Sequence, residues 1–152
     1  MDSRTESTEQ SGTPPPTRNP VVVIIKSNAL EKQDLIMNVL ITAKMCPQIC
    51  RIGKADSLVI DHERKMWQEH YAEHKGKDFY DRLVDEMAES PYAAYLVFLP
   101  DGLSYDDLTG VKRLARIIIK PGEKKSQNGL HISDSREAAI HEAKNMFNVD
   151  LS

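Results

Sequence analysis

The chain has 152 residues, of which 40% are hydrophobic and 28% charged, and its formal net charge at pH 7 is −3. These values are typical of one globular domain, and the small net charge gives no general attraction to nucleic acid or to an anionic membrane. No apolar run approaches the roughly 20 residues that span a bilayer, and the acidic N-terminus does not resemble a secretory signal. Two cysteines, Cys46 and Cys50, do not make a disulfide framework or a zinc site, so we predict a cytoplasmic protein with reduced thiols.

Residues 1–20 form a compositionally distinct N-terminal segment. They are rich in Ser, Thr, Gln and Pro and contain no large apolar side chain beyond Met1. A segment that buries so little apolar surface cannot offset the entropy that it loses on ordering. We therefore predict a disordered tail over 1–20, either a simple lead-in or a weak docking segment, followed by one domain over 21–152.

The first half of the predicted domain alternates strand and helix patterns. The β-branched run Val21–Ile25 predicts a strand that is buried on both faces. Apolar residues at helical spacing then predict a helix over 30–44, which Pro47 prevents from continuing. Partial alternation over 49–60 predicts the second strand.

The second half contains further helices and one well-defined strand. Asp61 has the position of an N-cap for a helix over 62–74, and another helix follows. The aromatic and β-branched run 92–99 predicts a third strand, and apolar spacing predicts a helix over 104–115 before a short apolar strand at 116–119. This order of elements implies an α/β fold and fits a ferredoxin-like split β-α-β-β-α-β core.

The C-terminal region combines a histidine with the start of a helix. Asp134 and Glu137 have capping-box spacing, and an apolar stripe follows them through Ala138, Ala139, Ala143, Met146 and Phe147. We therefore expect His131 on an irregular turn ahead of a helix N-terminus, where backbone N–H groups and the helix dipole favour an anion such as phosphate. A neutral imidazole there can act as a nucleophile toward phosphorus, although a bare histidine before a helix usually has a structural role.

The longer pattern around this histidine is more specific. The run Asn-x-x-His-x-Ser-Asp-Ser over 128–135, with Glu142 eleven residues after His131, resembles the active-site signature of nucleoside diphosphate kinases. The resemblance covers most of the domain and implies that family's fold, a ferredoxin-like antiparallel sheet with helices. It also implies that His131 is the phosphorylated nucleophile, that Glu142 holds its other ring nitrogen, and that Ser133 hydrogen-bonds to Glu142.

Three further stretches extend the resemblance to a nucleotide site. The Glu-His-Tyr sequence over 69–71 and the helix that begins near Phe79 resemble the segments that line the family's nucleotide slot. They imply that Tyr71 lies beside the nucleophile and that Phe79 stacks on the base, whereas both residues taken alone read as half-buried packing residues. Lys26 resembles a family lysine that contacts the phosphates, and the resemblance implies that Asn128 contacts sugar or phosphate.

The resemblance weakens over 110–127, where the family supplies phosphate-binding arginines. Arg113, or Lys112 in another register, takes the place of the first arginine, and Lys125 takes the place of the second. Lysine is a point charge that lacks the bidentate fork of arginine, so the second exchange is not conservative for phosphate. Ile132 also replaces the glycine that follows the family's histidine.

Two functional hypotheses follow. The one that we favour is transfer of the γ-phosphate of a nucleoside triphosphate to a nucleoside diphosphate through phosphorylated His131, with Mg²⁺ carried by the nucleotide phosphates and no metal site on the protein. The alternative is a catalytically impaired family member that serves as a nucleotide-binding or protein-interaction module, because the altered 110–127 region costs phosphate contacts.

The expected partners are nucleotides and further copies of the chain. The resemblance implies a homo-oligomer, but the family's hexamer is in doubt because the altered region forms subunit contacts in the family. No membrane association is expected. The small basic patch of Lys120, Lys124 and Lys125 gives little support for nucleic-acid binding.

Overall fold

The computed structural model describes residues 19–53, 60–119 and 129–151. In chain order its elements are β1 (Pro20–Ile25), the 3-10 helix η2 (Ser27–Lys32), α1 (Gln33–Thr42), β2 (Pro47–Gly53), α2 (Ile60–His70), η3 (Ala72–His74), α3 (Tyr80–Ala88), β3 (Tyr92–Phe98), η4 (Tyr105–Asp107), α4 (Leu108–Ile119), β4 (Leu130–Ile132) and α5 (Arg136–Phe147). Among the described residues, no helix combines the length and apolar character needed to cross a bilayer.

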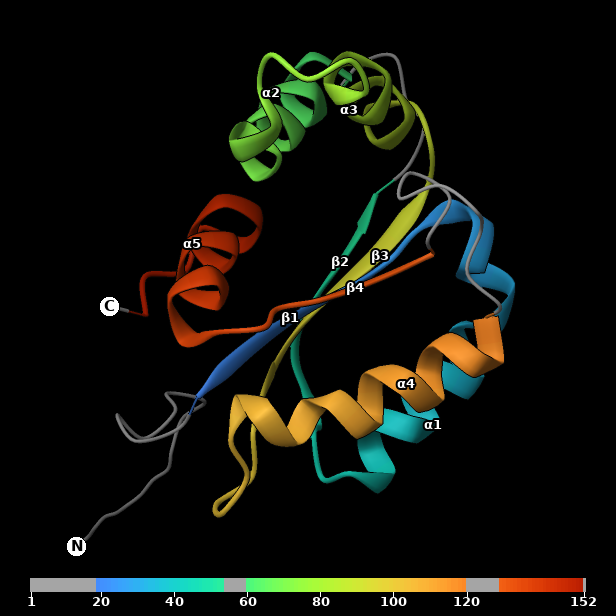
Figure 1. Cartoon of the computed structure of the whole chain (residues 1–152), viewed down its shortest axis with the longest axis vertical. Coiled ribbons are helices and arrows are strands. Elements are labelled where there is room, and N and C mark those ends of the chain that lie inside the picture. The colour runs from blue at the N-terminus through green and yellow to red at the C-terminus, as the bar shows by residue number, and fades with distance from the viewer. Residues whose placement is uncertain (1–18, 54–59, 120–128, 152) are drawn as a thin grey trace, which may run out of the picture.

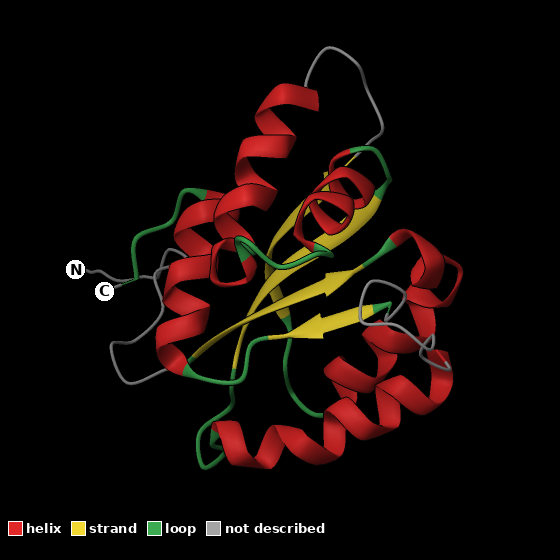
Figure 2. Cartoon of the chain, turned by 45° about the horizontal axis from the view of Figure 1, so that its top comes forward, coloured by secondary structure: helices red, strands yellow, loops and turns green. Residues whose placement is uncertain are grey.

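The four strands form one antiparallel sheet with the order β2-β3-β1-β4. Figure 2 shows the sheet in yellow among the helices. β1 and β3 pair along the whole of β1, from Pro20 opposite Phe98 to Ile25 opposite Ala93. The segment containing α1 connects β1 to β2 across the intervening β3, and the segment containing α4 connects β3 to β4 across β1. The predicted ferredoxin-like split β-α-β fold is therefore confirmed.

Helices cover both faces of the sheet, as Figure 1 shows. α2, α3 and α5 pack on the face of β1 that presents Val22 and Ile24, whereas α1 and α4 pack on the face that presents Val21, Val23 and Ile25. Every residue of β1 is buried, as expected for an unbroken β-branched run in the interior of a covered sheet. Because β1 touches both layers, side chains from either layer can meet where this strand ends.

Two expected boundaries in the first half of the domain are wrong. β2 ends at Gly53 and α2 begins at Ile60, so the strand does not continue to residue 60 and Asp61 lies inside the helix rather than at its N-cap. Residues 54–59 lie outside the described part of the chain. Ile60 is the first residue of α2 and packs against the core. In a short stretch, an apolar residue that packs in this way gives the same pattern as an apolar residue of a strand.

The expectations for the region around His131 are also wrong in two respects. Arg116–Ile119 continues α4 instead of forming a strand, because the first helix-breaking residue after Ala115 is Pro121. His131 lies in β4, an edge strand paired with β1, rather than on an irregular turn. β4 has only three residues, which is too short for alternation of apolar and polar residues to be legible.

The C-terminal helix α5 begins and ends as the apolar stripe predicts, but its N-cap differs. Ser135 is the N-cap residue, and its Oγ accepts a hydrogen bond from the backbone N–H of Ala138 at 3.1 Å, so Asp134 does not have that role. At the other end, Asn148 adopts a left-handed conformation with a φ of 56°. Asparagine tolerates this conformation and commonly ends helices in this way.

A buried polar network ties α2 to strands β2 and β3. Glu63 is 4% exposed and forms an ion pair with Arg51 of β2. The Tyr92 hydroxyl donates to Oε1 of Glu63 at 2.8 Å and accepts from Nε of Arg51 at 2.8 Å. A buried carboxylate is costly unless its oxygens are paired. Tyr92 and Arg51 together provide the partners that stabilise the buried carboxylate of Glu63.

We expect Tyr92→Phe to lower the free energy of unfolding by about 1–3 kcal/mol, because it leaves a buried carboxylate oxygen without its donor. Urea unfolding followed by circular dichroism measures the change. Tyr80→Phe is the matched control, since the Tyr80 hydroxyl makes a single long hydrogen bond of 3.4 Å to the carbonyl of Gln68. Equal losses in the two variants would contradict a specific role for the network.

Candidate active site

A cavity of about 220 Å³ opens where β1 ends and β4 begins. Side chains from both helical layers reach it, because it lies at the edge of the sheet. It is lined by Lys26, His70, Tyr71, Glu73, His74, Leu83, Arg116, Leu130, His131 and Glu142. The lining therefore combines three imidazoles with two cationic and two carboxylate side chains in one small space.

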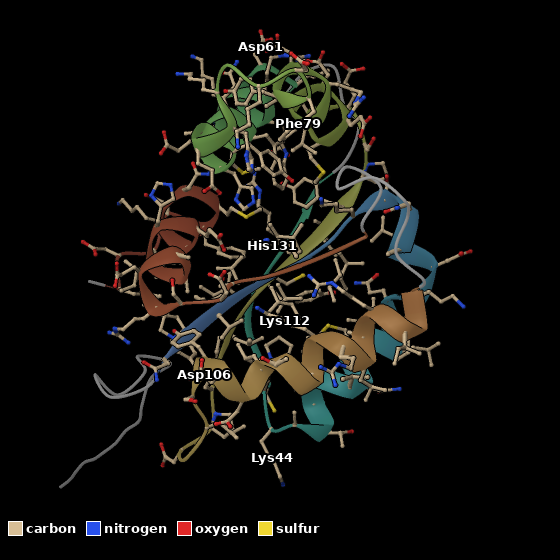
Figure 3. All side chains as sticks on the ribbon, viewed as in Figure 1. Lys44, Asp61, Phe79, Asp106, Lys112 and His131 are labelled. Carbon is tan, nitrogen blue, oxygen red and sulfur yellow. The ribbon has the colours of Figure 1, made fainter. Side chains whose placement is uncertain are left out.

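His131 is positioned by the register of β4 against β1. It lies opposite Ile24, whereas its neighbours Leu130 and Ile132 point into the core on the α1 and α4 side. Alternation along the strand turns His131 to the face covered by α2 and α5, and Figure 3 shows it there at the centre of the molecule. The side chain is 30% exposed, which leaves it accessible from the cavity.

Two side chains in series hold this histidine. Nε2 of His131 lies 2.9 Å from Oε1 of Glu142, and Oγ of Ser133 donates to the same oxygen at 2.8 Å. Ser133 is itself fixed to the central strand: its Oγ accepts from the backbone N–H of Val22 at 2.9 Å, and its own N–H donates to the Val22 carbonyl at 3.0 Å. The sheet therefore sets the position of the carboxylate as well as that of the imidazole.

The carboxylate of Glu142 is ionised at neutral pH although it is buried. Burial alone would raise the pKa of Glu142, but the hydrogen bond from His131, electrostatic interactions with His131 and His70, and the hydrogen bond from Ser133 outweigh it, so the pKa is lowered. An ionised carboxylate can only accept a hydrogen bond, so Nε2 must be the donor, which assigns the Nε2–H tautomer to His131. That tautomer leaves a lone pair on Nδ1, for which the described residues offer no hydrogen-bond donor.

His70 is a second imidazole beside the first. Its ring centroid lies 5.0 Å from that of His131 in an edge-to-face arrangement, and its ring also contacts Trp67 and Tyr71. Burial and then the charge of His131 lower the pKa of His70 to about 3, so the ring is neutral at physiological pH. Its Nδ1 is buried and has no hydrogen-bond partner among the described residues.

Two cationic side chains face the histidines. Lys26 is buried at the end of β1, with its Nζ 5.9 Å from the centroid of the Tyr71 ring. Arg116 reaches the cavity from α4, and its buried Nε has no hydrogen-bond partner within the described ranges. A buried donor without an acceptor is costly in the absence of a ligand, so this end of the cavity is suited to an anion.

Comparison with known proteins decides the family. The sequence model of the nucleoside diphosphate kinase family matches residues 19–151. The chain belongs to the nucleoside diphosphate kinase family. Nucleoside diphosphate kinase 6 of Xenopus tropicalis is 32% identical over 133 residues, which cover 78% of this chain and 73% of that protein. A nucleoside diphosphate kinase of Streptomyces coelicolor is 37% identical over 91 residues, or 53% of this chain and 63% of that one.

Solved structures of the family share the fold. The nucleoside diphosphate kinase of Halobacterium salinarum, determined in complex with CDP, superimposes with a TM-score of 0.64 at 21% identity, covering 87% of this chain and 89% of that one. The enzyme of Aquifex aeolicus gives a TM-score of 0.63 at 21% identity, covering 86% and 96%. At this level of identity the similarity speaks for the fold alone.

The structure brings four of the nine predicted site residues to the cavity, and a fifth lies directly behind it. Lys26, Tyr71, His131 and Glu142 line it, and Ser133 supports it from behind. Phe79 is not among the lining residues; it packs against the core with its ring centroid 5.1 Å from that of His74. Lys125 and Asn128 lie outside the described residues.

The arginine at the cavity is not the one that the sequence suggests. Arg113 is exposed and does not line the cavity, whereas Arg116, one helical turn later, does. Lys112 is half-buried on α4, on the other side of the sheet from His131 in Figure 3. The sequence pattern predicts a strand over 116–119, so it does not place Arg116 on the same helix as Arg113. For that reason Arg116 is missing from the site residues predicted from sequence.

Because His70 is held neutral, it makes stability depend on pH in a defined direction. The unfolded chain takes up a proton on this residue below its ordinary pKa of 6.5, but the folded chain does so only near 3. The unfolded state therefore binds more protons, and the free energy of unfolding falls as pH drops through this window, by up to about 1.4 kcal/mol per pH unit.

We expect His70→Gln to lack this contribution, so that the stability difference between the natural chain and the variant shrinks as pH falls below about 6.5. Urea unfolding at a series of pH values measures it, with His62→Gln, a change of an exposed histidine on the same helix, as control. A difference that is constant with pH would contradict a buried neutral His70.

Proposed function

We propose that this protein is a nucleoside diphosphate kinase that transfers the γ-phosphate of a nucleoside triphosphate to a nucleoside diphosphate through phosphorylated His131. The observation that carries the proposal is the hydrogen-bonded chain Ser133–Glu142–His131, which opens onto a cavity with two cationic side chains. The family relatives named above are called nucleoside diphosphate kinases, which agrees with this assignment.

In the first half-reaction, Nδ1 of His131 attacks the γ-phosphorus. The bond from that phosphorus to the bridging oxygen breaks, and the nucleoside diphosphate leaves with the electron pair. The imidazole becomes positively charged while Nε2 keeps its proton, and the carboxylate of Glu142, 2.9 Å away, stabilises that charge. Ser133 contributes by holding the carboxylate in place.

In the second half-reaction, a β-phosphate oxygen of an acceptor nucleoside diphosphate attacks the same phosphorus. The N–P bond breaks, its electron pair returns to Nδ1, and the enzyme is restored with the same tautomer. Phosphoryl transfer of this kind depends mainly on positioning and electrostatic stabilisation. Strand β4 and the fixed Ser133 supply the positioning of His131. The histidine can stay in this position through both half-reactions.

Charge stabilisation falls to the cationic side chains. Lys26 and Arg116 face the cavity and are suited to the phosphates, and we propose that Lys125 and Asn128 add contacts there. His70 remains neutral, so it fills the site without adding a charge. Tyr71 lines the cavity together with His131, and we propose that Phe79 stacks on the base of the nucleotide.

The part of the chain that the structure describes includes no oxygen-rich cluster suited to Mg²⁺. Among the described residues, the one cluster of metal-binding side chains consists of His70, His131 and Glu142, a nitrogen-rich set that does not suit this ion. The proposed Mg²⁺ is therefore held by the nucleotide phosphates, where it neutralises their charge.

We also propose that the protein forms a homo-oligomer through the free edge of β2. β2 is one of the two edge strands of the sheet, and Ile49, Cys50 and Ile52 on it are exposed. An uncovered edge strand with apolar side chains is a ready surface for pairing with another copy.

The first test is acid-labile labelling of the protein by γ-labelled ATP with Mg²⁺. We expect the natural chain to be labelled, the label to transfer to added GDP, and His131→Ala to take up none, because the proposed nucleophile is Nδ1 of His131, the imidazole that Glu142 supports through its other nitrogen. A folded protein that binds nucleotide without labelling would contradict the kinase and favour a nucleotide-binding module.

The second test separates the two candidate arginines. We expect Arg116→Gln to lower kcat/KM on the order of 10²–10³-fold, because it removes one donor to the transferring phosphate. Arg113→Gln, on the same helix but exposed, should change it far less. If Arg113→Gln had the larger effect, the sequence-based assignment of Arg113 as the phosphate-binding arginine would hold instead.

A further inference from the structure

We propose that His70, His131 and Glu142 form a binding site for a divalent transition-metal ion, with Zn²⁺ as the ion that fits best. One ligand atom of each residue lies within 4.8 Å of the others, so a single ion placed among them can reach all three after small side-chain movements. The inference rests on this cluster alone and does not depend on the proposed kinase activity.

The donor set resembles that of open zinc sites. Two imidazole nitrogens and one carboxylate oxygen make three protein ligands, which leaves a fourth tetrahedral position facing the cavity for water. The same set is a poor one for Mg²⁺ or Ca²⁺, which prefer six or more oxygen ligands. Zn²⁺ and Cu²⁺ bind imidazole more strongly than the earlier first-row ions do.

His70 supplies the second observation that points to a ligand. Its Nδ1 is buried and has no hydrogen-bond partner among the described residues. A buried polar nitrogen without a partner is costly, and a ligand bound at the cluster would remove that cost. Tight packing against Trp67 and Tyr71 holds the ring beside His131.

The charges around the cluster permit a cation. Lys26 and Arg116 line the cavity and oppose a positive ion, but Glu73 and Glu142 line it as well, so the formal charge of the lining is balanced. Glu142 is hydrogen-bonded to Nε2 of His131 at 2.9 Å. An ion at the cluster would therefore sit on the carboxylate side of the cavity.

Binding would change the protonation of His131. The metal takes the lone pair of Nε2, so the proton now shared by Nε2 and Glu142 must leave that nitrogen, and the neutral ring can then carry its proton only on Nδ1. The ion also withdraws Glu142 from the histidine. A metal-bound site thus has neither a free Nδ1 lone pair nor a carboxylate partner, and Zn²⁺ would inhibit the proposed phosphorylation.

Metal binding is tested without nucleotide, on the full chain with both exposed cysteines replaced by serine (Cys46→Ser and Cys50→Ser), so that thiols cannot bind the ion. Calorimetry with Zn²⁺ gives stoichiometry and affinity, and absorption with Co²⁺ reports four-coordinate geometry. We expect one ion per chain. His70→Gln and Glu142→Gln, checked separately for folding, should each weaken binding about tenfold or more.

The matched control is His141→Gln, which changes an exposed histidine that lies on the same helix as Glu142 and pairs with Glu69 at 3.2 Å. It should leave the affinity for Zn²⁺ unchanged. NMR of the His131 ring provides a readout independent of the variants, because saturating Zn²⁺ should move its proton from Nε2 to Nδ1. The proposal is overturned by absence of saturable binding, by equal loss in His141→Gln and His70→Gln, or by an Nε2 proton that persists at saturation.

Discussion

The buried hydrogen bond from Ser133 to Glu142 is the contact on which the site depends. The backbone and the hydroxyl of Ser133 are hydrogen-bonded to Val22 in the middle of β1. Ser133 therefore holds Oε1 of Glu142 in a fixed position relative to the sheet. An ionised carboxylate in this environment is tolerated only because its hydrogen bonds are satisfied. Without Ser133, His131 would be the sole donor to that oxygen among the described residues.

The electrostatic arrangement follows from that contact. Glu142 stays charged, His131 keeps a defined tautomer, and His70 stays neutral because it is buried against aromatic rings. A charged His70 would compete for Glu142 and oppose the nearby Lys26. The cavity can therefore hold cationic groups for an anionic ligand on one side and an anionic partner for the histidine on the other.

The fold could be predicted because its strongest signals are local. The run Val21–Ile25 and the stripe of α5 need no tertiary information, and the spacing of Ser133 and Glu142 from His131 reflects a strand, a tight connection and one helix. Arg116 could not be found in this way, because its place depends on α4 continuing past Ala115. The neutrality of His70 is likewise a tertiary property, created by rings that are brought to it in the fold.

The short strand β4 places a parity constraint on the chain. Side chains alternate between the two faces of a sheet, so a slip of one residue against β1 would turn His131 away from Glu142 and bury it among the aliphatic residues packed against α1 and α4. Pairing over three residues gives little resistance to such a slip. The hydrogen bonds between Ser133 and Val22 add further resistance. Ser133 thereby fixes the register of β4 and so decides which of two neighbouring side chains faces the cavity.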